Sequence, residues 1–90
     1  MQVRENWTWL TCRLDGVRDS GHQTDLEVLL ESTSEEPGMP DLIAQFRGNH
    51  ILIRLPGPLA NPPPSRFVIK ARLAGPGRIW GDAGTIRQAG

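Results

Sequence analysis

Apolar and polar side chains alternate along most of this chain, most clearly in the segment 66–73, RFVIKARL. Every second position of that segment is apolar: Phe67, Ile69, Ala71 and Leu73. The positions between them hold three cations and one valine: Arg66, Val68, Lys70 and Arg72. A period of two is typical of a β-strand that buries one face and exposes the other. We therefore expect a strand here, with its cations directed to solvent.

Three further segments show the same period: WTWLTCRL at 7–14, LEVLLE at 26–31 and HILIRL at 50–55. The segment LIAQFRG at 42–48 lies close enough to the last of these to form a hairpin about Gly48 and Asn49. It has a second interpretation, because a proline and an acid stand just before it, where a helix would begin. The segment 42–48 is therefore expected to be either a strand or one short helical turn.

Segments rich in glycine, proline and polar residues separate the predicted strands: DGVRDSGHQ at 15–23, STSEEPGMP at 32–40 and PGPLANPPPS at 56–65. The last has five prolines in ten residues, which excludes a helix or a central strand and predicts an extended surface loop. The segment GPGRIWG at 75–81 has Trp80 where a dinucleotide-binding fingerprint requires its third glycine. We expect a tight hairpin there.

Together these segments predict an all-β protein. Five or six short strands in a chain of 90 residues are too many for a flat, exposed sheet and favour a small antiparallel barrel. The chain is similar to OB-like and SH3-like barrels in its number of strands and in its long first strand. Since no long helical period and no internal repeat is visible, we expect residues 1–90 to form a single domain.

The first predicted strand has two candidate inner faces. One side carries Leu10, Cys12 and Leu14, and the other carries Trp7 and Trp9. Two exposed tryptophans are unfavourable unless something covers them, whereas a curled barrel strand can bury both sides at different points. We expect at least one of the two tryptophans in the core, and a stacking or interface role stays open for the other.

The charges are segregated along the chain, although the formal net charge is zero. Residues 1–45 have three arginines and nine acids, a net charge of −6, and residues 46–90 have seven cations and one acid, a net charge of +6. Such a division indicates an anionic partner or self-association. Arginine outnumbers lysine nine to one, and its planar fork suits phosphate and aromatic contacts, although a GC-rich genome would produce the same bias.

The sequence has no recognisable catalytic or metal-binding pattern. Cys12, His22 and His50 match no zinc-ligand spacing, and a serine at position 20 near His22 does not by itself make a nucleophile and base. The single cysteine excludes an intrachain disulfide, and no apolar run has the length of a signal peptide or a membrane span. We expect a cytoplasmic binding protein with no metal, no cofactor and no enzymatic activity.

The leading prediction is a binding module for single-stranded nucleic acid, in which cations follow the phosphates and an aromatic ring stacks on a base. The residues expected to do so are Arg47, Arg66, Lys70, Arg72, Arg78 and Trp80. The competing hypothesis is a subunit or adaptor that docks on protein, or a self-assembling homo-oligomer, because an acidic half and zero net charge disfavour generic nucleic-acid binding. A purely structural interpretation is also open, in which the cations of 66–73 are solvated or pair with Glu27 and Glu31.

Overall fold

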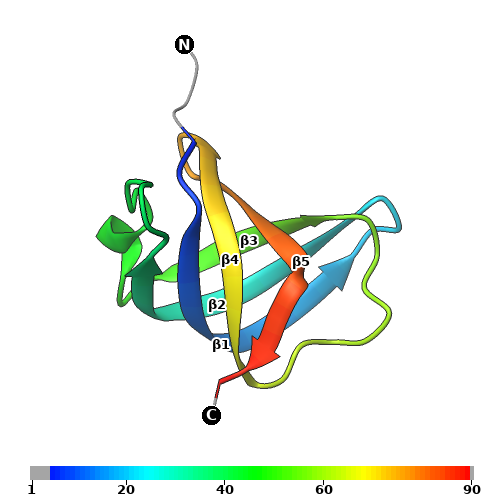
Figure 1. The fold of residues 1–90 in the computed structure, drawn as a ribbon. Helices are drawn as coiled ribbons and strands as arrows, with labels where there is room; N and C mark the ends of the chain where they lie inside the picture. The colour runs from blue at the N-terminus through cyan, green and yellow to red at the C-terminus, as the bar shows by residue number, and fades with distance from the viewer. Residues whose placement is uncertain (1–4, 90) are drawn as a thin grey trace.

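Five strands close into a small barrel in the computed structural model, which describes residues 5–89. The strands are β1 (Thr8–Asp19), β2 (Gln23–Glu35), β3 (His50–Pro56), β4 (Arg66–Gly75) and β5 (Arg78–Gln88). Their order around the barrel is β1-β2-β3-β5-β4, and β4 returns to pair with β1 (Figure 1). The expected all-β barrel is thus confirmed. Within residues 5–89 no helix has the length and apolar character that crossing a membrane requires.

One seam of the barrel departs from the antiparallel pattern. β3 and β5 run parallel and pair only through Ile53 with Ile79 and Arg54 with Trp80, whereas the other four pairings in the described chain are antiparallel. A parallel pair needs a long connection between its strands. Here that connection is the proline-rich loop, then β4, then the turn into β5.

The barrel interior is filled by aliphatic side chains, one phenylalanine and one cysteine. The buried apolar residues are Leu10, Cys12, Leu26, Val28, Leu30, Ile43, Ile53, Leu55, Phe67, Ile69, Ala71 and Ile79. The alternation in β4 is confirmed, since Phe67, Ile69 and Ala71 are fully buried and the residues between them are not. Full closure removes the exposed strand edges of an open sheet and leaves the outer surface of the strands available.

Gly81 makes room for the core where β5 crosses it. A Cβ atom at Gly81 would lie 2.7 Å from Ile69, 2.8 Å from Ile53 and 2.9 Å from Leu55. These distances are shorter than van der Waals contact on three sides. A small barrel alternates small and large inner residues to fill its taper, so Gly81 is the small residue that lets three large ones meet.

The segment 42–48 is not a strand. It forms a single 3-10 turn, Ala44–Phe46, which agrees with the helical interpretation and excludes the hairpin about Gly48 and Asn49. Asp41 explains the turn, because its Oδ1 accepts hydrogen bonds from the backbone N–H groups of Ile43 at 3.1 Å and Ala44 at 2.9 Å. The turn then places Ile43 in the core.

Two predicted loops are partly strand. β1 continues to Asp19 and β2 continues to Glu35, so the turn between β1 and β2 is shorter than the predicted segment 15–23. The cause is pairing between the two strands: the ladder runs on to Asp19 and Thr24, with bulges that absorb the irregular spacing. In contrast, the tight hairpin predicted after β4 is confirmed, with Gly77 at a φ of 68° in the turn.

Candidate nucleic-acid interface

Trp7 and Trp9 lie on the outer side of the barrel wall. Leu10 and Cys12 on the opposite side of the strand are fully buried, as is Thr8 between the two tryptophans. Both indoles are half-buried, so the expectation that at least one of them belongs to the core is wrong. The apolar side of β4 faces the leucine side of β1, with Leu10 opposite Ile69, and this pairing fills the interior without an indole.

Cations from the neighbouring strands cover both rings. Lys70 places its Nζ 5.7 Å from the centroid of the Trp9 ring, and Arg72 places its Cζ 5.7 Å from the centroid of the Trp7 ring. Arg87 of β5 approaches Trp9 as well, with Cζ at 5.9 Å. These distances are within the range of cation–π attraction. The contacts supply the cover that two outward tryptophans need.

Trp80 lies on the same outer surface, one strand further along. It is half-buried on β5, opposite Arg72 of β4 on one side and opposite Arg54 of β3 on the other. Aromatic and cationic residues therefore alternate across the barrel wall in the order Trp7, Arg72, Trp80 and Arg54. We call the set Trp7, Trp9, Arg54, Lys70, Arg72, Trp80 and Arg87 the aromatic–cationic face.

The arrangement of a tryptophan beside a cation occurs twice along β1 and β4. Trp7 and Trp9 are two residues apart, as are Arg72 and Lys70 beside them, and two residues of a strand span about 6.6–6.8 Å. The face therefore contains two equivalent aromatic–cation pairs, separated by a distance close to the step between nucleotides of an extended strand. Arg72 has no carboxylate ion-paired with it among residues 5–89, so its charge is available to a ligand.

The second pair carries a resident anion, Glu36. Its carboxylate accepts a hydrogen bond from the indole Nε1 of Trp9 at 2.9 Å and one from Nζ of Lys70 at 3.3 Å. The Trp9 hydrogen bond, and after it the contact with Lys70, lower the pKa of Glu36 below its ordinary value. Glu36 is therefore ionised at neutral pH, and the charge of Lys70 is offset in the free protein.

Arg66 is held at the other end of β4. Its Nε lies 2.7 Å from the Glu31 carboxylate, and Arg13 reaches the same carboxylate at 4.0 Å. The prediction that the cations of 66–73 pair with Glu27 or Glu31 is therefore right for Arg66 and Glu31. Glu27 pairs with Arg18 of β1 at 3.7 Å instead.

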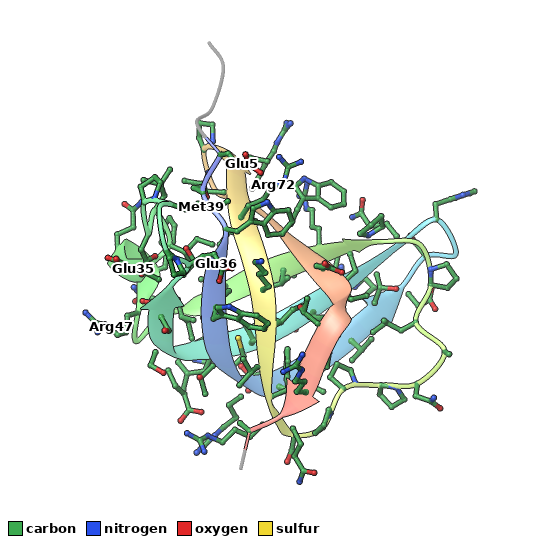
Figure 2. The ribbon with its side chains drawn as sticks, viewed as in Figure 1. Glu5, Glu35, Glu36, Met39, Arg47 and Arg72 are labelled. Atoms are coloured by element: carbon green, nitrogen blue, oxygen red, sulfur yellow. The ribbon has the colours of Figure 1, made fainter. Side chains whose placement is uncertain are left out.

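Of the remaining two predicted site residues, Arg78 lies at the edge of the aromatic–cationic face and Arg47 lies outside it. Arg78 opens β5 at the turn, exposed and two residues before Trp80, which puts it at the rim. Arg47 follows the 3-10 turn between β2 and β3, and Figure 2 shows it at the far edge of the molecule, well away from Arg72. The structure thus groups Lys70, Arg72 and Trp80 and separates Arg47 from them.

Four members of the face were absent from the predicted site: Trp7, Trp9, Arg54 and Arg87. The signal for Trp7 and Trp9 was present in the period of two, which put them on one side of a strand. Arg54 and Arg87 gave no such signal, because their position beside Trp80 and Trp9 depends on which strands are neighbours.

The outward face of β2 carries acids with cations beside them: Asp25 lies opposite Arg18 of β1 and Arg54 of β3, and Glu27 pairs with Arg18. The outward residues of β2 include Asp25 and Glu27, and a shallow pocket there is lined by Asp15, Glu27, Val28, His50, Ile51 and Leu52. Nδ1 of His50 lies 2.8 Å from Asp15. Within residues 5–89 no group of three histidine, cysteine or acidic side chains is placed to hold a metal ion.

Three features set the aromatic–cationic face apart: it holds all three tryptophans of the chain, each is beside a cation, and the rings are partly open to solvent. Such a surface offers flat apolar rings and positive charge to the same ligand. In comparisons with known proteins, no family model, no curated protein and no solved structure matches this chain.

Proposed function

We propose that this protein binds single-stranded nucleic acid through the aromatic–cationic face and acts by binding, without catalysis. The observation that carries the proposal is the position of Trp7, Trp9 and Trp80 on one outer surface with a cation beside each. Proteins that hold single strands combine aromatic rings, on which bases stack, with cations that follow the phosphates. Every base has a flat π-face, so such a surface tolerates different sequences.

The direction of a bound strand follows from the two repeated pairs. Bases stacked on Trp7 and Trp9 would lie about one nucleotide apart along β1, and their phosphates would meet Arg72 and Lys70 of β4. A third base would stack on Trp80 across the wall. The ligand is therefore a short single-stranded segment, since a duplex keeps its bases stacked on each other and offers no free face.

The barrel architecture is compatible with binding of a single strand, but the proposed binding surface differs from the one that OB barrels commonly use. OB barrels are five-stranded, and they commonly bind oligonucleotides on the face of strands 2 and 3. In this protein the outward acids of that face, Asp25 and Glu27, lie beside Arg54 and Arg18, and β2 and β3 contain no tryptophan on which a base could stack. We therefore infer that the strand lies over β1, β4 and β5, an OB-like barrel used from another side.

A second candidate function is docking on a protein, including another copy of this chain. The observation that favours it is that exposed acids of β2, such as Glu27, and exposed cations of β4, such as Arg72, lie on strands that are not neighbours in the barrel. The acids of one copy and the cations of another are opposite in charge and would give head-to-tail contacts. Light scattering at low and high salt tests this function, because ion pairs weaken as salt shortens the Debye length. A mass that stays monomeric at both salt concentrations contradicts charge-driven self-association.

The test of nucleic-acid binding is fluorescence anisotropy of a labelled oligo-dT at several salt concentrations. Arg72→Ala should weaken binding and reduce the salt dependence of the logarithm of affinity by about 0.7. Arg47→Ala is the matched control, since it removes the same charge from a site far from the face. If the wild-type protein does not bind oligo-dT at low salt, the proposed function is wrong.

A further inference from the structure

Glu36 is fixed by groups from two strands of the barrel. It directly follows β2, and its carboxylate lies between Trp9 of β1 and Lys70 of β4. The same connection is tied down a second time, because the backbone N–H of Trp7 contacts the sulfur of Met39 at 3.3 Å. Figure 2 shows Glu36 and Met39 beside β1, on the side of the barrel where β1 and β4 meet.

The two donors that hold this carboxylate are suited to other anions as well. An indole N–H only donates a hydrogen bond, and a lysine ammonium only donates. A phosphodiester group presents two non-bridging oxygens that share one negative charge, as a carboxylate does, and needs donors of the same kind. Each donor meets a different oxygen of the Glu36 carboxylate, Oε2 for Trp9 and Oε1 for Lys70.

We propose that Trp9 and Lys70 form a phosphate-binding subsite, which the carboxylate of Glu36 occupies in the free protein and a phosphodiester of the bound strand takes over. The inference rests on the proposed function and adds the position of one phosphate to it. In the free protein Glu36 closes the second aromatic–cation pair, while the first pair, Trp7 and Arg72, is open. Binding then replaces one anion by another at this subsite.

The position of Glu36 allows that exchange. The side chains of Lys70 and Glu36 are 25% and 30% exposed, so a ligand reaches them from solvent without opening the core. The low pKa of Glu36 keeps it negatively charged at neutral pH, which makes it a competitor for phosphate. Arg87, which also approaches Trp9, adds a second cation beside the subsite, and Asp82, opposite Lys70 on β5, adds an acid.

Replacement of Glu36 by alanine tests the subsite, with Glu35→Ala as the matched control. Glu35 is the adjacent acid and is exposed, and it has no ion pair within the described residues. Glu36→Ala should tighten oligo-dT binding at low salt by roughly 1.5- to 5-fold, the range expected for loss of one competing surface ion pair. Glu35→Ala removes the same charge and should change affinity by clearly less.

Two further variants show whether the gain comes from the subsite. Lys70→Gln should cost more affinity in the Glu36→Ala background than in the wild type, because only there is Lys70 without its resident anion; the difference is a double-mutant coupling. Trp9→Phe keeps a ring for stacking and removes the indole N–H, and it should cancel part of the gain from Glu36→Ala. Circular dichroism confirms that each variant folds.

The outcomes separate this inference from the proposed function. Equal tightening by Glu36→Ala and Glu35→Ala, or the same cost of Lys70→Gln in both backgrounds, overturns the subsite and leaves binding at the face intact. Absence of binding by both the wild type and Glu36→Ala overturns the proposed function. Binding by Glu36→Ala alone supports the subsite, because it shows that Glu36 blocks the face, and it overturns single-strand binding as the function of the wild-type protein.

Discussion

The side-chain amide of Asn6 pairs with both backbone polar groups of Leu73. Its Nδ2 donates to the carbonyl oxygen of Leu73 at 2.9 Å, and its Oδ1 accepts from the N–H of Leu73 at 2.7 Å. Asn6 precedes β1 and is 1% exposed, so its side chain continues the pairing of β1 and β4 beyond the backbone ladder, which begins at Thr8 with Ala71. This contact fixes Trp7 beside Arg72.

Asn6→Ala should therefore destabilise the protein. It leaves the N–H and carbonyl of Leu73 without these partners, and an unsatisfied buried polar group costs roughly 1–3 kcal/mol. Urea unfolding measures the change in the free energy of unfolding. Asn61→Ala, in the exposed proline-rich loop, is the control and should stay within about 0.5 kcal/mol of the wild type. Equal stability of the two variants would contradict the structural role of Asn6.

Replacement by valine should change the free energy of unfolding in opposite directions at two buried threonines, Thr8 and Thr24. Oγ1 of Thr8 has no hydrogen-bond partner among the described residues, whereas Oγ1 of Thr24 donates to the carbonyl of Gly57 at 2.9 Å. Thr8→Val should raise the free energy of unfolding by about 1 kcal/mol, since it removes an unsatisfied hydroxyl, and Thr24→Val should lower it by a similar amount. Thermal unfolding followed by circular dichroism compares them, and a loss of stability in Thr8→Val would be the wrong sign.

Gly81→Ala should lower the free energy of unfolding by roughly 1–3 kcal/mol, the usual cost of overpacking a core. The added Cβ would lie within 2.9 Å of side chains on β3 and β4. Gly84→Ala is the comparison, because its Cβ would meet only the exposed Asp82 carboxylate, at 3.3 Å. Urea unfolding of both variants is the measurement, and a Gly81→Ala protein as stable as Gly84→Ala would show that the core has room.

Cys12 should be unreactive in the folded protein. Burial, and after it the negative charge of Glu31, raise the pKa of the Cys12 thiol from 9.0 to about 12, so the nucleophilic thiolate is scarce at pH 8. A thiol-reactive dye should modify Cys12 only after unfolding, with a rate that rises in denaturant. Because the folded pKa is raised, the contribution of Cys12 to stability is complete below pH 9 and is lost as pH rises through 12. Modification at the rate of a free thiol would contradict its burial.

Trp80 and Arg54 are neighbours in the β3–β5 seam and should affect binding in different ways. Trp80→Ala should weaken oligo-dT binding by about 1–3 kcal/mol through lost stacking and leave the salt dependence nearly unchanged. Arg54→Ala should reduce the salt slope by about 0.7, because one phosphate contact is lost. Anisotropy titrations at four or more salt concentrations separate the two effects, and identical slope changes would mean that Trp80 does not stack on a base.

The sequence by itself predicted four of the five strands, β1 to β4, and the inner face of β4; it gave no strand for β5. The alternation in 66–73 fixed β4 and its inner residues, because only a period of two puts Phe67, Ile69 and Ala71 on one side. The prolines of 56–65 excluded regular structure there, since proline lacks the N–H that a ladder needs. Both features follow from local geometry and therefore need no knowledge of the rest of the chain.

Only the tertiary structure decided which side of β1 faces inward and which charges meet. Large apolar residues stand on both sides at the start of that strand. The choice between the sides follows from its partner: pairing with β4 matches Leu10 with Ile69 and leaves Trp9 opposite Lys70 on the outside. Contacts such as Lys70 with Glu36 join residues 34 positions apart. The physical reason is that alternation assigns side chains to two faces, whereas register and closure of the barrel assign those faces to core or solvent and bring distant residues together.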